Sequence, residues 1–477
     1  MGRLLFLQDL EFEYLGPMYL SSMLKEHGHK CKLLVGKTLK DFNHEIETYR
    51  PDLIGFSIMT GSHLWAVQIA EEIKGRYNIP SIFGGAHPTY FPEFVNNDSV
   101  DIIVRGEGEE ALLEVMNAFT DHAPLKNIGN LTYKENGKII ENPIGKLKQN
   151  IDEYPFPDRN LYGSLEGRID RSVRAVLTSR GCPYNCTFCF QAKAREIYKN
   201  KGKYVRYRSI DNVLEECKTL KSETDVKRII IKDDTFGINK EWLYDFLPRY
   251  KKEVGLEFMC LLRADIIASD RETAFRLAEN GCRTVYWGIE SGNEKLRNLI
   301  LRKKVTDEKI FKAAEYLHKA GIKFLTFNIL GLPDETLEDA ISTVELNIKI
   351  KTDYPWCSLY MPLPGTELTQ YSIDKGYLDS QYYDINIQNT FHNMSVMNMK
   401  NINEITNLQR FFQTAVLWPK TFPFIKRIIY IKPNPMFNAW FAVVYFYVYW
   451  LSEGRKFLQS LVFAIRNYKH VISKKIK

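Results

Sequence analysis

The chain has 477 residues, of which 45% are hydrophobic and 26% charged, values typical of a globular protein with two or three domains. The formal net charge of +7 is spread along the sequence apart from a basic C-terminal tail, which gives no case for nucleic-acid binding. Outside one close triplet the cysteines are isolated, and the apolar stretch before Asp9 is too short for a signal peptide. We therefore expect a reduced, cytoplasmic protein without a disulfide framework.

The first predicted domain, residues 1–140, alternates strand patterns with helix patterns. Strands are expected over 4–7, 32–35, 53–58, 81–83 and 101–104, and helices over 18–27, 42–49 and 63–77. Repeated β-α units predict a doubly wound parallel sheet with helices on both faces. Ligands of such sheets bind at the carboxyl ends of the strands, so the glycine-rich segments 84–89 and 106–109 are candidate ligand loops.

A hairpin and a linker follow. The apolar segments 131–133 and 139–140 flank Asn136-Gly137, a dipeptide typical of tight hairpin turns. Residues 141–172 then carry prolines at 143, 155 and 157 and many polar side chains, which predicts a connector that wraps the surface.

The predicted core domain, residues 173–385, resumes the alternation of strands and helices. Its strands are expected over 173–177, 228–232, 258–262, 284–289, 324–330 and 358–361. Each is followed by polar or glycine residues, and six strands are two fewer than a full (β/α)8 barrel needs. Charged side chains at several strand ends indicate function, because their burial would otherwise cost several kcal/mol.

The C-terminal region, residues 386–477, has a different composition. Residues 433–452 carry no charge and are rich in aromatic side chains, and a helical amphipathic pattern and several lysines follow. About twenty residues could just cross a bilayer, but the tyrosines and the prolines at 433 and 435 disfavour a span. We predict a helical region, 433–477, that contacts the inner face of the membrane peripherally. The alternative is a helical cap over the barrel mouth that buries the aromatic side chains.

The cysteine triplet is the most specific chemical signal in the sequence. Cys182, Cys186 and Cys189 are spaced i, i+4 and i+7 in a loop that leaves the strand at 173–177. Three close thiolates suit an iron–sulfur cluster, and three ligands leave one iron of a four-iron cluster open to a substrate. The alternatives are a structural zinc site and three unrelated core thiols. A zinc site would need a fourth ligand nearby, but the next cysteine is Cys217 and no histidine lies between.

With Phe188 just before the last cysteine, the triplet resembles the signature of the radical S-adenosylmethionine (SAM) superfamily. The resemblance implies a [4Fe–4S] cluster on the three cysteines and a partial (β/α)6 barrel. It also implies that the open iron binds SAM, which is cleaved to a 5′-deoxyadenosyl radical by one electron from a low-potential flavodoxin- or ferredoxin-type donor.

The same resemblance carries over residues for SAM binding. Glu290 and Ser291 match the family's Gly-Ile-Glu-Ser motif, whose carboxylate could accept hydrogen bonds from the ribose hydroxyls. The full set implied for SAM is Phe188, Asp233, Asp234, Arg263, Glu290, Ser291 and Gly331. For the charged members of this set, a salt bridge at the barrel mouth or a helix cap is the alternative.

The N-terminal domain resembles the cobalamin (B12)-binding domain that precedes many radical SAM cores. The residues implied for cobalamin are Ser57, Thr60, Gly84, Gly85, His87, Gly106 and Glu107. The Asp-x-His-x-x-Gly fingerprint that supplies a histidine to cobalt is absent, since the corresponding loop, 8–16, contains no histidine. His87 is expected near the site and not as a cobalt ligand. A generic α/β module, or a domain that has lost cobalamin, would have the same pattern.

Together these resemblances predict a cobalamin-dependent radical SAM enzyme that methylates an unactivated carbon of an apolar or natural-product-like small molecule or lipid. Radical cyclisation, oxidation or carbon–carbon coupling of a tetrapyrrole or lipid is the alternative chemistry. An iron–sulfur or cobalamin sensor without turnover is an alternative of another class. Methylthiotransferases are disfavoured because Cys31 stands alone where they carry an additional cysteine triad.

Overall fold

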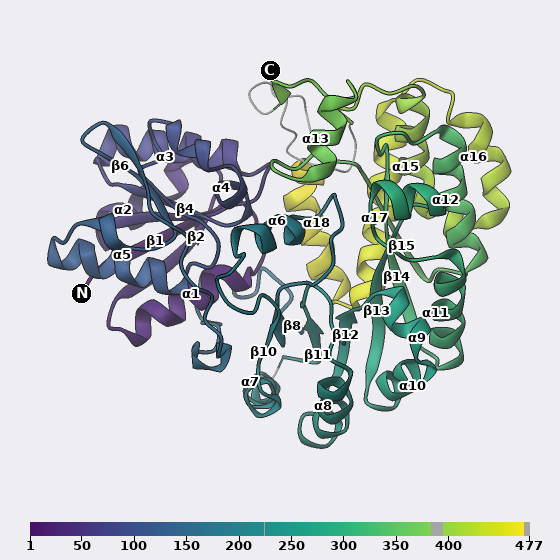
Figure 1. Ribbon diagram of the computed structural model, residues 1–477, viewed down its shortest axis with the longest axis horizontal. Coiled ribbons are helices and arrows are strands. Elements are labelled where there is room, and N and C mark those ends of the chain that lie inside the picture. The colour runs from purple at the N-terminus through teal and green to yellow at the C-terminus, as the bar shows by residue number, and fades with distance from the viewer. Residues whose placement is uncertain (224, 383–394, 472–477) are drawn as a thin grey trace. The chain divides into compact units, whose positions relative to one another are not determined.

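The computed structural model describes residues 1–223, 225–382 and 395–471, and its internal contacts divide the chain into two compact units (Figure 1). The first unit comprises Met1–Ile169, Lys193–Tyr204 and Leu363–Gly365, and the second comprises Asp170–Ala192, Val205–Pro362 and Thr366–Lys477. The domain boundary predicted at 385 and the lysines at 474, 475 and 477 lie outside the described residues.

The first unit is built on a seven-stranded sheet of order β2-β1-β3-β4-β5-β6-β7. Its strands are β1 (Arg3–Gln8), β2 (Lys30–Val35), β3 (Leu53–Ser57), β4 (Ser81–Gly84), β5 (Ile102–Val104), β6 (Leu131–Glu135) and β7 (Lys138–Glu141). The first five are parallel, and β6 and β7 form the antiparallel hairpin predicted around Asn136-Gly137. The predicted doubly wound sheet is confirmed.

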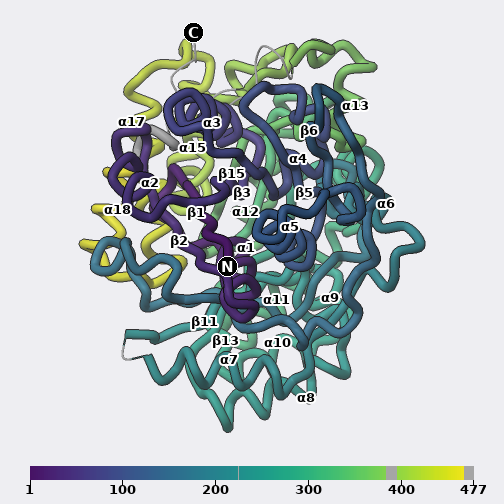
Figure 2. Tube along the Cα trace, turned by 90° about the vertical axis from the view of Figure 1, so that its left-hand side faces the viewer, coloured from purple at the N-terminus to yellow at the C-terminus, as the bar shows by residue number. Residues whose placement is uncertain are grey.

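Helices cover both faces of this sheet because its central strands are apolar on both sides. Leu4 of β1 packs toward α1 (Leu15–Glu26) and α5 (Glu109–Asp121), whereas Leu5 packs toward α2 (Asn43–Tyr49) and α3 (His63–Tyr77). In Figure 2, α1 and α5 accordingly lie together and apart from α2 and α3. The unit also contains α4 (Ala86–Tyr90) and the 3₁₀ helices at Leu39–Asp41, Pro92–Asn96, Leu125–Asn127, Ile151–Glu153 and Gly163–Leu165.

The second unit is built on an open sheet of six parallel strands in the order β15-β14-β13-β12-β11-β8. They are β8 (Val173–Val176), β11 (Arg228–Ile231), β12 (Glu257–Leu261), β13 (Cys282–Glu290), β14 (Lys323–Leu330) and β15 (Tyr354–Leu359), and β9 (Ser179–Arg180) pairs separately with β10 (Arg206–Tyr207). The last predicted strand, 358–361, begins earlier, at Tyr354, because it pairs with β14 from Leu325 onward.

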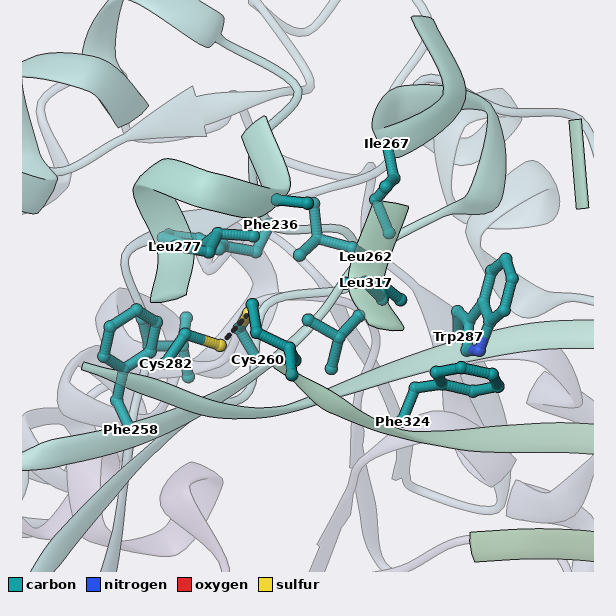
Figure 3. Packing of buried hydrophobic residues seen from close by; sticks show 14 of the residues in the cluster. Phe236, Phe258, Cys260, Leu262, Ile267, Leu277, Cys282, Trp287, Leu317 and Phe324 are labelled. Carbon is teal, nitrogen blue, oxygen red and sulfur yellow. Dashed lines mark hydrogen bonds between the residues drawn. The ribbon is translucent and has the colours of Figure 1, made fainter. Parts of the chain in front are cut away.

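The outer face of the six-stranded sheet is completely covered by helices. They are α7 (Ile210–Ser222), α8 (Lys240–Glu253), α9 (Ala264–Ser269), α10 (Arg271–Glu279) and α11 (Asp307–Lys319), and α12 (Leu337–Lys349) follows β14. Phe258, Trp287 and Phe324 belong to this core, and the Sγ atoms of Cys260 and Cys282 lie 3.9 Å apart within it (Figure 3). These outward side chains are at most 6% exposed, so the outer layer carries stability.

Helix α15 (Ile402–Leu417), which the sequence pattern did not reveal, covers β15, the edge strand of the sheet. Nε2 of Gln409 donates to the carbonyl of Cys357 at 3.0 Å, and Nε2 of Gln413 donates to that of Pro355 at 3.2 Å. Four helical residues rise about 6 Å, and two strand residues about 6.6 Å. The two glutamines therefore match alternate carbonyls and satisfy an edge that would otherwise be open to pairing.

Helix α17 (Pro435–Glu453) covers the lower part of the inner face of the sheet, near the N-terminal ends of the strands. Val444 and Val448 pack there on Val173, Met259 and Tyr354. This burial resembles the predicted cap, but the helix lies at the opposite end from the barrel mouth. No described helix combines the length and apolar character needed to cross a membrane. The remaining helices are α6 (Phe190–Ile197), α13 (Glu367–Asp374), α16 (Phe422–Ile428), α18 (Phe457–Val471), a π-helix at Leu296–Ile300 and a 3₁₀ helix at Pro419–Thr421.

Candidate active site

The cysteine loop leaves the carboxyl end of β8 and is fixed to the end of β11 by one carboxylate. Asp233, which is 1% exposed, accepts hydrogen bonds from the Thr178 amide (2.7 Å), the Thr178 hydroxyl (2.5 Å) and the Ser179 hydroxyl (2.6 Å). These donors occupy its oxygens, so Asp233 acts here as an anchor of the loop. Its role in SAM binding stays a prediction.

The three thiols lie close enough to influence one another. Burial, with smaller contributions from the neighbouring Cys186 and Cys182, raises the pKa of Cys189 to about 12. Burial also raises the pKa of Cys186, which the cations Lys303 and Arg263 oppose. Within the described residues, no three His, Cys, Asp or Glu side chains are arranged around a single metal ion. Cubane ligands each bind a different iron, so the donor set fits a cluster on Cys182, Cys186 and Cys189.

Arg263, at the end of β12, connects several parts of this loop. Its guanidinium lies 3.5 Å from the centre of the Tyr184 ring and bonds both oxygens of Asp265, at 2.9 and 3.1 Å. It also donates to the Lys303 carbonyl at 2.7 Å and lies 4.0 Å from Sγ of Cys186. The predicted carboxylate pairing of Arg263 is thus made within the chain, with Asp265.

Glu290 and Lys303 form a buried ion pair at the end of β13. Nζ of Lys303 lies 2.7 Å from Oε1 of Glu290, and both residues are 6% exposed. Glu290 has a φ of 69°, an uncommon conformation for a side chain of this size, where β13 loses its regular register with β14. A Cβ on Gly288 would lie 1.9 Å from Oε1 of Glu290, so only glycine leaves room for the pair.

Other residues predicted for SAM also lie at the carboxyl ends of the strands. Burial raises the pKa of Asp234 to about 6, although solvent reaches its side chain. Ser291 is fully buried, and its carbonyl accepts from Arg297 at 2.8 Å. Gly331, with a φ of 78°, donates its amide hydrogen to Glu335 at 2.5 Å. Phe188 packs against a buried hydrophobic cluster of the second unit.

The loops predicted for cobalamin lie at the carboxyl edge of the first sheet, after β3, β4 and β5. A Cβ on Gly85 would lie 2.5 Å from the Ile58 carbonyl, which makes glycine necessary where these two loops meet. A Cβ on Gly84 would meet nothing closer than the Val104 carbonyl at 3.9 Å, so the chain leaves space for a ligand beside this backbone. Ser57 ends β3 beside this space, and the assignment of these loops to the tail of cobalamin stays a prediction.

His87 is turned into the protein behind these loops. It is 1% exposed, stacks on His63 at 4.0 Å and shares a hydrogen bond of 3.0 Å with Thr60 through Nδ1. Burial lowers the pKa of His87 to about 3 and that of His63 to about 4, so both rings are neutral. His87 thus orders the loop that contains Thr60 and does not present a ligand to cobalt.

The loop after β5 is held by an aromatic side chain from a distant segment of the same unit. The Glu107 amide donates to the Tyr198 hydroxyl at 2.7 Å, and a Cβ on Gly106 would lie 1.9 Å from that hydroxyl. In the first loop, burial raises the pKa of Asp9 to about 6, and the Gln8 side chain donates to the carbonyls of Leu10 (2.5 Å) and Phe12 (2.7 Å).

Several residues of the site were not identified from the sequence. They are Tyr184, Lys232, Lys303, Glu335, His63 and Tyr198. Tyr184 lies between two of the cysteines, a position that could have singled it out. Lys303 and Tyr198 are distant in sequence from the groups they contact, and no local pattern marks them.

Comparison with known proteins agrees with this arrangement. The family model of the radical SAM superfamily matches residues 176–346, and that of the B12-binding domain matches residues 9–116. An uncharacterized methyltransferase of Pyrococcus horikoshii is 34% identical over 372 residues, which cover 76% of this chain and 79% of the relative.

Two further proteins are more distant. The anaerobic magnesium-protoporphyrin IX monomethyl ester cyclase of Rubrivivax gelatinosus is 26% identical over 378 residues, 75% of this chain and 66% of the relative. The cobalamin-dependent S-adenosylmethionine radical enzyme OxsB, solved with aqua-cobalamin and S-adenosylmethionine bound, superposes with a TM-score of 0.68 at 18% identity. That likeness covers 98% of this chain and 75% of OxsB and shows a shared fold.

The matched cysteine loop, the partial barrel and the B12-binding fold occur here in one chain, and the sequence relationship spans most of its length. The protein is accordingly an enzyme with a [4Fe–4S] cluster, SAM and cobalamin as its cofactors, and it belongs to the radical SAM superfamily, among the members that carry a B12-binding domain.

Proposed function

We propose that this enzyme methylates an unactivated carbon of an apolar or natural-product-like small molecule. The observation that carries the proposal is the presence of both cofactor modules in a chain 34% identical to an uncharacterized methyltransferase. When bound, the cluster, SAM and cobalamin supply radical formation and a transferable methyl group.

The residues of the chain have distinct tasks in this proposal. Cys182, Cys186 and Cys189 hold the cluster, and Asp233 keeps their loop in place through its bonds to Thr178 and Ser179. The Glu290–Lys303 pair presents a fixed carboxylate beside the SAM site. In the first unit, Gly84 and Gly85 let the cobalamin tail approach the backbone. The reducing electron is assigned to a flavodoxin- or ferredoxin-type donor.

Corrinoid content is the decisive test. The protein is purified without oxygen, loaded with iron, sulfide and cobalamin, desalted, and examined by visible spectroscopy and cobalt analysis. Near-stoichiometric cobalamin beside the cluster is expected. The Gly85→Ala variant is expected to lose cobalamin and keep the cluster, because its new Cβ would meet the Ile58 carbonyl. The matched variant Gly75→Ala, on α3 with open space around it, should keep both.

A cluster without retained cobalamin would contradict methyl transfer. Radical cyclisation, oxidation or carbon–carbon coupling of a tetrapyrrole or lipid would then take its place. The specific observation in favour of that second candidate is the relationship to the magnesium-protoporphyrin ester cyclase, at 26% identity.

We also propose a cytoplasmic location with peripheral membrane contact through residues 433–477. One face of α17 is exposed and apolar, with side chains spaced at helical intervals: Met436, Trp440, Val443 and Tyr447. Sedimentation with phosphatidylserine vesicles tests this contact. Binding that is lost in Trp440→Glu and kept in Glu315→Gln, on the distant helix α11, is expected, and failure of the unmodified protein to sediment would contradict the contact.

A further inference from the structure

The inner face of the six-stranded sheet is closed at one end and open at the other. Near the N-terminal ends of the strands, the inward side chains Ile230, Met259 and Leu325 are buried beneath α17. Toward the carboxyl ends, the inward side chains are partly exposed while their outward neighbours remain buried. These partly exposed side chains are Leu177, Leu261, Phe327, Trp356 and Ser358, and Gly288 lies partly exposed among them. Such alternation along several strands defines a solvent-accessible recess above a closed floor.

The wall of this recess is largely aromatic. Trp356 of β15 lies 4.4 Å from Tyr445 of α17, measured between ring centres, and Phe327 lies 6.3 Å from Tyr286. Rings in these arrangements offer flat apolar surface for stacking. The carboxyl end of the recess leads toward the strand ends that carry the cysteine loop and Asp234.

One lysine projects into this apolar recess. Ile229 and Ile231 belong to the outer core and Ile230 to the inner one, so Lys232, next in the alternation, faces inward. Its amide continues the pairing with β8 by donating to the Val176 carbonyl at 2.9 Å. The side chain is exposed to solvent, and burial of its charge by the surrounding protein lowers its pKa.

The ammonium of Lys232 has no protein partner among the described residues. Glu453, whose charge opposes the lowering of the pKa of Lys232, is already bonded to Arg455 at 2.5 Å. Arg455 in turn donates to the Asp170 carbonyl at 2.7 Å, so this neighbouring group is satisfied within itself. A cation held unpaired in a mostly apolar recess is suited to an anion that the protein itself does not supply.

We propose that this recess takes the substrate and that Lys232 binds an anionic group, such as a carboxylate, on an otherwise flat and apolar substrate. The inference rests on the proposed function, whose substrate it narrows to a class. The carboxylate of SAM is the other source of the same chemistry, and the experiment separates the two.

The test uses a matched pair of fluorescent probes, 1-naphthaleneacetate and its neutral amide, 1-naphthaleneacetamide. Binding of each to the full-length protein, with cluster and saturating SAM, is measured under anaerobic conditions without reductant. The unmodified protein should bind the anion at least about tenfold more tightly than the amide, the usual worth of one charge-assisted hydrogen bond. Lys232→Gln should abolish that preference, and Lys232→Arg should retain most of it.

Lys323→Gln is the matched control, because Lys323 is an exposed lysine at the opposite end of the same sheet, and it should keep the preference. Equal affinity for the two probes, binding of neither probe, or an unchanged preference in Lys232→Gln would overturn the proposal. Weaker SAM binding in Lys232→Gln with the probe preference intact would also overturn it and assign the lysine to the cofactor. Cobalamin content does not enter this measurement, so its failure is distinguishable from failure of the proposed function.

Discussion

The two faces of the six-stranded sheet differ although the same strands build both. The outer face, with Phe258 and Trp287, is completely buried under helices. The inner face is closed only beneath α17 and is accessible around Phe327 and Lys232. Burial of the outer side chains stabilises the fold, whereas the inner side chains near the carboxyl ends are only partly buried and leave space for ligands. Within a single strand, the outward side chains therefore contribute to stability and the inward ones are available for ligand binding.

The largest difference between a site variant and a core variant is expected at the cysteine loop. Cys186→Ala should abolish SAM cleavage, because two thiolates cannot hold the cluster in place. The control Cys217→Ala removes a buried thiol of α7 in the outer core and should keep both cluster and cleavage at reduced stability. The measurement is 5′-deoxyadenosine formed with reductant. Cleavage retained in Cys186→Ala would refute the assignment of the loop.

Two phenylalanines test the faces directly. Phe258→Ala on the outer face should lower the free energy of unfolding by about 3–5 kcal/mol, since it leaves a cavity in a closed core. Phe327→Ala, which borders the accessible recess, should cost less than about 2 kcal/mol. Denaturant unfolding followed by circular dichroism measures both. Equal losses would show that the inner face is as closed as the outer one.

A smaller effect is expected at Gly288, where the inner face approaches the ion pair. Gly288→Ala should destabilise the protein by about 1–3 kcal/mol, because its Cβ would overlap Oε1 of Glu290. Gly75→Ala, in α3 with no atom within 4 Å of the new Cβ, should be neutral or stabilising by up to about 1 kcal/mol. A neutral Gly288→Ala would mean that the Glu290–Lys303 contact is not fixed. Thermal unfolding provides the measurement.

A further effect, which depends on pH, concerns Glu335, after β14. Burial raises its pKa from 4.5 to about 8, so the folded protein holds a proton there that the unfolded chain releases above pH 4.5. This contribution to stability is complete below pH 4.5 and is lost as pH rises toward 8, by about 1.4 kcal/mol per pH unit. Glu335→Gln should remove that slope, as measured by unfolding at several pH values. An unchanged slope would show that other groups cause it.

Much of this architecture could be predicted because its signals are local. Alternating apolar residues marked most strands to within a few positions, and the spacing of Cys182, Cys186 and Cys189 marked the cluster loop. Helix α15 was not predicted, because its glutamines suggest an exposed polar surface. The structure shows that they are buried and donate hydrogen bonds to the backbone carbonyls of β15. The aromatic stretch at 433–452 predicted membrane contact for side chains such as Val444 that in part cover the sheet.

The cofactor chemistry and the order of the two modules could be predicted, because thiolate spacing and β-α repeats are patterns of residues that are neighbours in the sequence. Which charged groups are already bonded within the chain, and which are available to a ligand, depends on contacts that form on folding. Asp233 and Arg263 were equal candidates with Asp234 as ligand groups, yet folding bonds the first two to the chain itself. Lys232 carried no signal, since an unpaired cation is recognised only when every element around it is in place.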